Sequence, residues 1–580
     1  MIRLSNSFRT CMVAALTPLA AVPAAAQYEP PKQMTLAPTG FDLTSARFTH
    51  KATDLSIGPF TLERSYVGGH QVPGSSHFGR NWTHNYSIYV VEKDRSSLNG
   101  IYVVRGRETA HFYQGLAAGN YGSDNPDSYG MKLQLVNGTF IFTDRTGDVY
   151  TFNPSVNAFP PPTNISPQLR NQRIARIDYA NGHTLTFTYA NSQLKQIASN
   201  YGYSLVFDLQ SEGYIQKACG YNRAVTAVTS SSTCANAALA ASYTYSGTWT
   251  NLANVVDVMG RNWGYDYEGD SAISKMTCVR QVNSSNCMVA NTYGPVAARH
   301  HIIHQTKADG SVWEHSIRLG ERDPDDYQLP GTPPPQSEGS YSGPEGVFVH
   351  ATFGGGLLDS YNDNGRITQL GWNGLELAKL THHEGNSVTY HRDARMNVLS
   401  EEWAPKPGST GVAAVSNLAA YPDPYSGGCT TVSAVLCNRP IWRRDFKGNQ
   451  PDYTYEPHGG VKTETGPAPT VGGVRPQVRY EYALRYAGVS NGAGHVPEAV
   501  GIYLPSRKAF CATGAASGWG CAVTGDEVVT TYDYGSDSGT NNLLLRSETV
   551  TAGGVIRRTC FGYDWMGNKI STTRPNGLCQ

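Results

Sequence analysis

Three histidines, His300, His301 and His304, are close enough in sequence to suggest a metal site. Imidazole is a common zinc ligand, but the ligands must converge on one ion. In a strand, residues at i and i+1 or i+3 project to opposite faces, so these rings would not converge. The same objection applies to His382 and His383. We therefore predict no metal and no cofactor.

Carboxylates are the next candidates. Asp323, Asp325 and Asp326 could supply oxygen ligands to calcium, but they lack EF-hand spacing and suit a solvated turn. The sequence contains no Gly-x-Ser-x-Gly elbow, no His-Glu-x-x-His and no phosphate loop. Paired carboxylates for glycoside hydrolysis can come from distant strands, so a carbohydrate-active enzyme stays an alternative. We assign no catalytic residue and expect a protein that is not an enzyme.

Cysteines supply a third chemistry. Cys11 lies near the N-terminus, and the other ten fall into neighbouring pairs without Cys-x-x-Cys knuckles, which favours disulfides over zinc in an oxidising compartment. The candidate pairs are Cys219 with Cys234, Cys278 with Cys287, Cys429 with Cys437, Cys511 with Cys521, and Cys560 with Cys579.

The N-terminal residues are typical of an export signal, which agrees with disulfide formation. Arg3 and Arg9 precede an apolar stretch, and Ala24 to Ala26 form a small-residue cleavage site. We predict a signal peptide over 1–26 and a periplasmic, cell-surface or extracellular location. No later stretch is apolar enough to span a bilayer, so no transmembrane segment is expected in the mature chain.

Composition indicates strands and turns. The 580 residues include 61 Gly, 33 Pro and 35 Tyr, and only 16% are charged. Lys+Arg and Asp+Glu both number 46, so no one-signed field points to nucleic acid.

The segments that must position these residues are strands. Leu185, Phe187 and Tyr189 alternate with threonines, and Tyr203, Leu205, Phe207 and Leu209 repeat the pattern, as half-buried antiparallel strands do. Earlier strands are expected at 60–66, 86–91 and 138–143. Proline-rich stretches mark breaks, and irregular insertions are expected at 404–440 and 465–525. The predicted organisation is an extended leader at 27–40, an N-terminal β domain at 41–153, a Pro-rich linker at 154–171, β repeats at 172–322, a Pro/Gly-rich loop at 323–346, and β repeats with Cys-containing insertions at 347–580.

A turn motif recurs along the chain. An acidic or amide residue is followed three positions later by Gly, and then usually by Arg or Asn. Asp or Asn can bond the backbone two residues on, and Gly accepts the positive φ that closes the turn. A tyrosine often precedes the motif, and we expect it to pack its ring while its hydroxyl stays in water. The copies include Asp257 with Gly260, Asn362 with Gly365, Asp445 with Gly448, Glu456 with Gly459 after Tyr455, and Asp564 with Gly567 after Tyr563.

The run Tyr563-Asp564-Trp565-Met566-Gly567-Asn568 resembles the YD repeat of Rhs proteins, and residues 58–66 and 78–86 are similar to the domain that precedes such repeats. The resemblance covers roughly residues 41–580 and implies an all-β fold, in which a short N-terminal β domain is followed by a wound antiparallel YD-repeat sheet. In relatives the shell encloses a C-terminal toxin released at an Asp-Pro-x-Gly-Leu-like element. Here Arg574-Pro575-Asn576-Gly577-Leu578 lacks that aspartate, so we expect an open or partial shell without its own toxin.

The expected role is an exported structural or surface-interaction protein, with further YD-repeat or toxin polypeptides as partners. A second class of function is a cell-surface carbohydrate-binding protein, in which Trp82, Trp263, Trp313 and Trp372 stack on surface glycans. The alternative for these rings is ordinary core and cross-strand packing.

Overall fold

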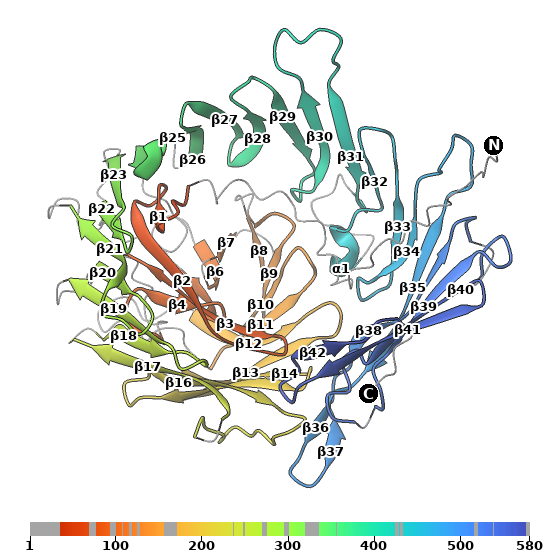
Figure 1. Ribbon diagram of the computed structural model, residues 1–580, viewed down its shortest axis with the longest axis horizontal. Helices are drawn as coiled ribbons and strands as arrows, with labels where there is room; N and C mark the ends of the chain where they lie inside the picture. The colour runs from red at the N-terminus through yellow and green to blue at the C-terminus, as the bar shows by residue number, and fades with distance from the viewer. Residues whose placement is uncertain are drawn as a thin grey trace, which may run out of the picture.

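The computed structural model describes residues 35–68, 77–92, 100–106, 108–114, 119–123, 128–155, 171–235, 237–247, 250–268, 275–294, 301–319, 336–354, 357–423, 429, 433–515, 520–537 and 539–575. Strands form nearly all of its regular structure, and they are arranged in a ring (Figure 1). The predicted signal peptide lies outside the described residues.

The first strands form a separate 4-stranded antiparallel sheet, called here the inner sheet, in the order β1-β2-β3-β4. Its strands are β1 (Phe41–Asp42), β2 (Arg47–Ile57), β3 (Phe60–Val67) and β4 (Trp82–His84).

The largest sheet is closed. Its closure depends on β12, which pairs with β5 as well as with β11 and β13. Strands β5 to β12 therefore form a ring, called here the closed barrel. They are β5 (Ile88–Glu92), β6 (Gly100–Arg105), β7 (Glu108–Gln114), β8 (Asn120–Gly122), β9 (Lys132–Val136), β10 (Thr139–Thr143), β11 (Val149–Asn153) and β12 (Asn171–Asp178).

From β12 the sheet continues as a long antiparallel strip, the wound sheet, in which each strand pairs with the next along the chain and β35 pairs with β38. Its first half contains β13 (Thr184–Ala190), β14 (Gln193–Ser199), β15 (Tyr203–Leu209), β16 (Ile215–Asn222), β17 (Leu239–Ser246), β18 (Asn251–Val256), β19 (Asn262–Glu268), β20 (Lys275–Arg280), β21 (Cys287–Tyr293), β22 (Ile302–Lys307), β23 (Val312–Leu319), β24 (Gln336–Ser342), the 3₁₀ turn η3 (Pro344–Gly346), β25 (Phe348–Gly354), β26 (Leu357–Asp363) and β27 (Arg366–Asn373).

The second half contains β28 (Glu376–Thr381), β29 (Ser387–Arg392), β30 (Val398–Ala404), β31 (Val415–Ala420), α1 (Ala434–Cys437), β32 (Trp442–Arg444), β33 (Asp452–Tyr455), β34 (Val461–Thr465), β35 (Gln477–Arg485), β38 (Ile502–Cys511), β39 (Glu527–Asp533), β40 (Ser547–Ala552), β41 (Val555–Tyr563) and β42 (Lys569–Thr572). A two-stranded hairpin, β36 (Gly488–Ser490) with β37 (His495–Pro497), projects between β35 and β38.

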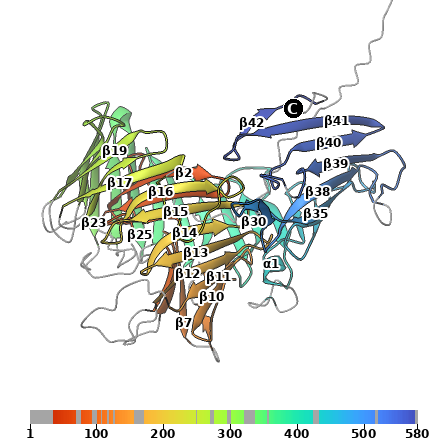
Figure 2. The same cartoon turned by 90° about the horizontal axis from the view of Figure 1, so that it is seen from below.

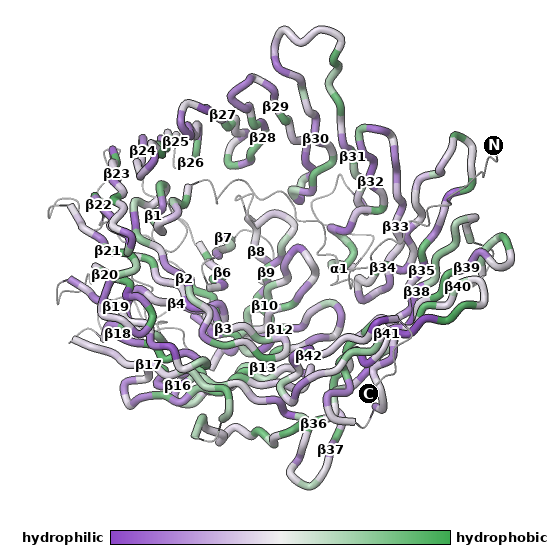
Figure 3. Tube along the Cα trace, viewed as in Figure 1, coloured by the Kyte–Doolittle hydropathy of each residue, from purple (hydrophilic) through white to green (hydrophobic). Residues whose placement is uncertain are grey.

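Alternating side chains explain the strands. In β13, Leu185 and Phe187 are buried while Thr186 is exposed, and in β15 Tyr203, Leu205 and Phe207 are buried. Apolar and polar residues are interspersed along the strip rather than gathered into one apolar segment (Figure 3). In the part of the chain that the structure describes, no helix has the length and apolar character needed to cross a membrane.

The core lies between the inner sheet and the wound sheet. β2 contacts β16 and β17, and β3 contacts β15, so the inner sheet covers the concave side of the strip (Figures 1 and 2). Aromatic rings fill the junction: the Phe41 ring stacks on His315 at 4.1 Å, and Trp82 meets Tyr265 edge-on at 5.1 Å. One continuous hydrophobic cluster includes residues from both layers.

Most of the register shifts in the described part of the strip precede aromatic residues. A β-bulge inserts an unpaired residue, which bends the strand and increases its twist. Register shifts fall between Thr188 and Tyr189, Thr244 and Tyr245, Asp266 and Tyr267, Thr292 and Tyr293, Thr352 and Phe353, Gly371 and Trp372, Thr454 and Tyr455, Glu481 and Tyr482, and Gly562 and Tyr563. The repeated bulge gives a physical reason for the winding.

The prediction of an all-β fold with a wound antiparallel sheet is confirmed. The largest sheet also contains a closed ring, because β12 pairs with β5. Strands also extend into segments expected to be irregular. Gln336–Ser342 forms β24 inside the predicted loop at 323–346, β31 and α1 lie within 404–440, and β35 to β38 lie within 465–525. Prolines and glycines between these strands concealed short alternating runs. Most of the predicted linker at 154–171 lies outside the described residues.

Candidate functional site

The recurring turn has a reproducible hydrogen-bond pattern. In the turn at Asp564, the Gly567 amide donates to the Asp564 carbonyl at 3.0 Å, and the Asp564 amide donates to the Asn568 carbonyl at 2.9 Å. The Asp564 Oδ1 atom accepts from the amides of Met566 and Asn568, and Oδ2 accepts from the Asn568 side chain. Asp445 makes the equivalent bonds to Lys447 and Asn449. The carboxylate thus stabilises the turn that joins the two strands.

Electrostatics agree with that role. The Asn449 side chain and the backbone amides hold the pKa of Asp445 below its usual value. Burial opposes ionisation of Asp257, yet hydrogen bonds from Trp263, Arg261 and the Met259 amide hold its pKa low as well. These aspartates are therefore charged acceptors within turns.

Two predicted copies differ from this pattern. Glu456 keeps the backbone bonds, with the Gly459 amide donating to its carbonyl at 2.8 Å. At Asn362 the turn is instead a two-residue hairpin, because Asp363 pairs with Arg366 and both Asn364 and Gly365 have positive φ. Asn-Gly strongly favours that tight hairpin, which explains the difference.

A further copy, at Asp393, was missed by sequence reasoning. Asp393 accepts from the amides of Arg395 and Asn397, and the Met396 amide donates to the Asp393 carbonyl. Met396, with φ of 68°, occupies the position that Gly takes elsewhere. The signal that could have revealed it is the Asp to Asn spacing of four residues, which also occurs at Asp445 and Asp564.

Aromatic residues after the bulges bond the preceding strand. Tyr267 Oη donates to the Leu252 carbonyl at 2.8 Å, and Tyr455 Oη donates to the Pro440 carbonyl at 2.7 Å. The same bond joins Tyr189 to Ile174, Tyr245 to Ile215, Tyr293 to Met276, Trp372 to Leu358, Tyr482 to Val461 and Tyr563 to Leu545. The hydroxyls of Tyr455 and Tyr563, expected to stay in water, thus each donate to a backbone carbonyl. Burial raises the pKa of Tyr455 to about 12.

A buried ion pair within the inner sheet bonds two tyrosines of the wound sheet. Arg64 Nε lies 2.8 Å from Asp54 Oδ1, and their side chains are 0% and 2% exposed. Tyr243 donates its hydroxyl to Asp54, and Arg64 donates to the Tyr265 hydroxyl. Burial raises the pKa of Asp54, although Arg64 opposes that shift. Because solvent and substrate have no access to this pair, its role is structural.

The end of the wound sheet meets its beginning at a seam, formed by the turns after β12, β14 and β16 and the segments 490–503, 541 and 565. Figure 2 shows the last strands lying to one side of β13 to β16. Asn222, 1% exposed, donates to Asn541 Oδ1 at 2.7 Å and to the Trp565 carbonyl at 2.6 Å. The Tyr503 amide donates to the Asn181 carbonyl at 2.9 Å. Arg223 forms an ion pair with Glu498.

Disulfides join four of the predicted pairs: Cys219 with Cys234, Cys278 with Cys287, Cys429 with Cys437, and Cys511 with Cys521. Cys560 is also disulfide-bonded, and its predicted partner Cys579 lies outside the described residues. Each of the four described bridges closes a short local loop.

The other candidate residues are not brought together. His300, Asp323, Asp325 and Asp326 lie outside the described residues. His301 is buried before β22, His304 is exposed within it, and His382 and His383 lie in the turn after β28. Among the described residues, no group of three or more His, Cys, Asp or Glu is arranged to hold a metal ion.

The glycan-stacking interpretation loses two of its four tryptophans. Trp82 and Trp313 are 0% and 6% exposed, and Trp263 and Trp372 are half-buried. Among the residues that the structure describes, the exposed indoles are instead Trp403 and Trp565.

No protein family model matches the sequence, and no curated protein does. Some solved structures are similar to this chain at low identity. The TcdB2–TccC3 complex is 9% identical over 87% of this chain and 26% of its own, with a TM-score of 0.33. The Photorhabdus luminescens Tc holotoxin pore is 9% identical over 88% of this chain and 29% of its own, with a TM-score of 0.31.

The N-terminal domain of the effector protein SpvB from Salmonella typhimurium strain LT2 is 10% identical, covers 63% of this chain and 97% of its own, and has a TM-score of 0.16. This chain spans about a quarter of the length of the Tc complexes. Similarities this low assign no activity or partner.

Proposed function

We propose that the protein is an exported structural shell of the Rhs/YD-repeat kind, whose wound sheet bounds an interior and whose role is mechanical rather than catalytic. The observation that carries the proposal is the unbroken pairing of strands from β5 to β35 and on through β38 to β42, with the end of the strip fixed to its beginning at the seam. Further YD-repeat or toxin polypeptides are the proposed partners.

The polar groups support a structural role, because those described above form hydrogen bonds or ion pairs with other groups of the protein. Asp54 and Arg64 bond each other and neighbouring tyrosines, and the turn carboxylates of Asp445 and Asp564 bond their own loops. An enzyme needs polar groups that converge where a substrate can reach them. Export is supported by the basic and apolar N-terminal residues and by the disulfides.

Small-angle X-ray scattering of the full purified chain tests the shell. A wound shell gives a pair-distance distribution shifted to long distances, as expected for a body whose mass lies away from its centre. A distribution typical of a solid globule would overturn the proposal. N-terminal sequencing after expression with the native leader tests export, and a chain that begins at Gln27 is the expected product.

A glycan array separates the shell from the sugar-binding alternative. We expect no binding by the native protein. Binding that is lost in Trp403→Ala or Trp565→Ala, which remove exposed indoles, would instead support a carbohydrate-binding protein.

A further inference from the structure

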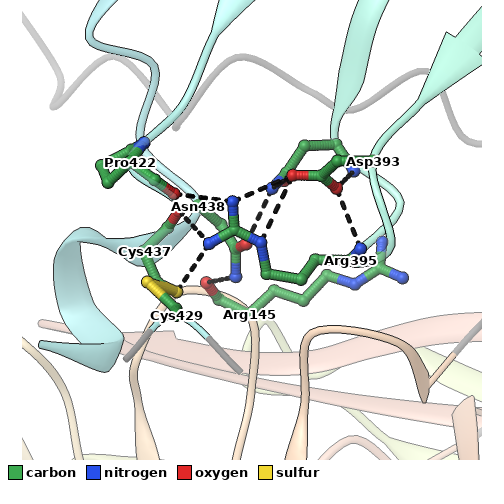
Figure 4. Close-up of polar contacts among 8 residues, drawn as sticks. Arg145, Asp393, Arg395, Pro422, Cys429, Cys437 and Asn438 are labelled. Atoms are coloured by element: carbon green, nitrogen blue, oxygen red, sulfur yellow. Dashed lines mark hydrogen bonds and ion pairs between the residues drawn. A yellow bond between two sulfur atoms is a disulfide. The ribbon is translucent and has the colours of Figure 1, made fainter. Parts of the chain in front are cut away.

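A second junction, away from the seam, ties the wound sheet to the closed barrel. Arg395, 1% exposed, lies in the turn between β29 and β30 (Figure 4). Its guanidinium donates to Asp393 Oδ2 at 2.9 Å, to the Pro422 carbonyl at 2.8 Å, and to the Cys437 carbonyl at 2.9 Å. Arg395 therefore bonds three parts of the chain: the β29–β30 turn, Pro422 after β31, and α1.

The helix α1 touches the barrel directly. Asn438 Nδ2 donates to the Arg145 carbonyl in the β10–β11 turn at 2.9 Å, and its Oδ1 accepts from Asn397. A Cβ atom on Gly147 would lie 2.5 Å from Val435 Cα, so the backbone of the barrel turn packs against the helix itself. The barrel also packs against the β29–β30 turn, because a Cβ atom on Gly130 would lie 3.2 Å from Arg395 Cβ.

Little in the local sequence stabilises α1. It spans four residues, too few for a helix to be stable alone, and Ser433 makes no side-chain capping bond. The Cys429–Cys437 disulfide closes this segment at its last helical residue, next to the bonds made by Arg395 and Asn438. That crosslink therefore constrains the segment that places Val435 and Asn438 against the barrel.

We propose that the Cys429–Cys437 disulfide is a redox-controlled latch, which holds the wound sheet against the closed barrel while oxidised and lets them part when a dithiol reduces it. The dithiol gives two electrons and two protons to the Sγ–Sγ bond, which becomes two thiols, and the dithiol becomes a disulfide. The latch does not require a cargo. A result that contradicts the latch would therefore leave the proposed shell function untouched, and the reverse also holds.

The chain offers a matched control. The Cys278–Cys287 disulfide joins the neighbouring strands β20 and β21 and has a sequence separation of 9, against 8 for the latch. Loops of equal length restrict the unfolded chain equally, so removing either bridge has nearly the same entropic effect. Of these two bridges, only Cys429–Cys437 lies next to residues that contact the barrel.

Hydrogen–deuterium exchange of the full chain tests the proposal. The double variant Cys429→Ser/Cys437→Ser is expected to speed exchange at 144–148 and 435–438 about tenfold, as local opening becomes easier. Asn438→Ala, which keeps the disulfide but loses the bond to Arg145, is expected to speed exchange at 144–148 as well. Cys278→Ser/Cys287→Ser is expected to leave both segments unchanged.

Unchanged exchange at 144–148 in the latch double variant would overturn the proposal, as would an equal increase in the Cys278→Ser/Cys287→Ser control. If the latch variant does not fold, folded wild-type protein is treated with dithiothreitol and followed by mass. Cys429 and Cys437 are 8% and 6% exposed, so the incubation continues until reduction reaches a plateau. Reduction of this bridge without faster exchange at 144–148 would equally refute the latch.

Discussion

Asn222 and Asn541 are joined by a side-chain hydrogen bond of 2.7 Å, although 319 positions separate them in the sequence. Asn222 also bonds the Trp565 carbonyl and the amide of Ala224. The winding of the sheet brings these residues together. Removing their contact therefore tests the winding directly.

Asn222→Ala is expected to lower the free energy of unfolding by about 2 kcal/mol, because it leaves buried polar groups without partners. Urea denaturation measures the loss, and faster amide exchange at Ser490 and Tyr503 localises it to the seam. Asn254→Ala, at a half-exposed position within β18, should stay within about 0.5 kcal/mol of wild type. Equal losses in both variants would contradict the seam.

Gly567 and Gly448 offer a second comparison at the seam. Both occupy the same position of the recurring turn, with φ of 89° and 84°. A Cβ atom at Gly567 would collide with the Tyr203 hydroxyl, whereas one at Gly448 meets nothing within 4 Å. Gly448→Ala should cost about 1 kcal/mol from backbone strain alone, and Gly567→Ala at least about 1 kcal/mol more. Thermal or urea unfolding that ranks them equally would argue against close packing at Tyr203.

The inner sheet should depend on its buried ion pair. Asp54→Asn is expected to destabilise the protein by about 3 kcal/mol or more, because it leaves the buried Arg64 charge uncompensated. The control is Glu63→Gln, which breaks the exposed pair with Lys51 between the same two strands and should cost less than about 1 kcal/mol. Denaturant titration at pH 7 compares them, and a small Asp54→Asn effect would show that the inner sheet does not rest on this pair.

Stability should fall in mild acid. Burial, with a smaller contribution from nearby arginines, lowers the pKa of His50 and of His84 from 6.5 to about 3. Between pH 6.5 and 3 the unfolded chain binds protons that the folded chain does not, so stability decreases as pH falls. Each histidine contributes about 2 kcal/mol of loss between pH 7 and 5. Denaturation at both pH values measures this, and His50→Phe should reduce the difference by its share; an unchanged difference would contradict the assignment.

The repeat tyrosines should contribute through their hydroxyls. Tyr189→Phe removes the bond to the Ile174 carbonyl and should cost about 1 kcal/mol, since a buried acceptor loses its donor. Tyr503→Phe, at a residue 38% exposed, should remain within about 0.5 kcal/mol of wild type in the same urea titration. No difference between the two would mean that the bond after the bulge does not stabilise the strand.

Local patterns predicted local structure well. Alternation over 60–66 and 138–143 corresponds to β3 and β10, and Asp445 and Asp564 form the expected turns, because strand period and turn chemistry depend on near neighbours. Relationships across the winding could not be read in this way. The seam at Asn222, the burial of Asp54 and the attachment of α1 to the barrel depend on where distant segments meet. Met396 was overlooked because tertiary contacts stabilise a positive φ where the pattern requires Gly.

The pairing of each strand with its neighbour has a consequence for how such a chain can change length. Adding or deleting one hairpin in the middle of the strip would leave every other strand correctly paired, since those pairings are local. It would nevertheless move the end of the strip by two strand widths, roughly 10 Å, so that Asn541 and Glu498 no longer face Asn222 and Arg223. The seam therefore sets the number of strands that complete the circuit, a constraint that no individual repeat contains.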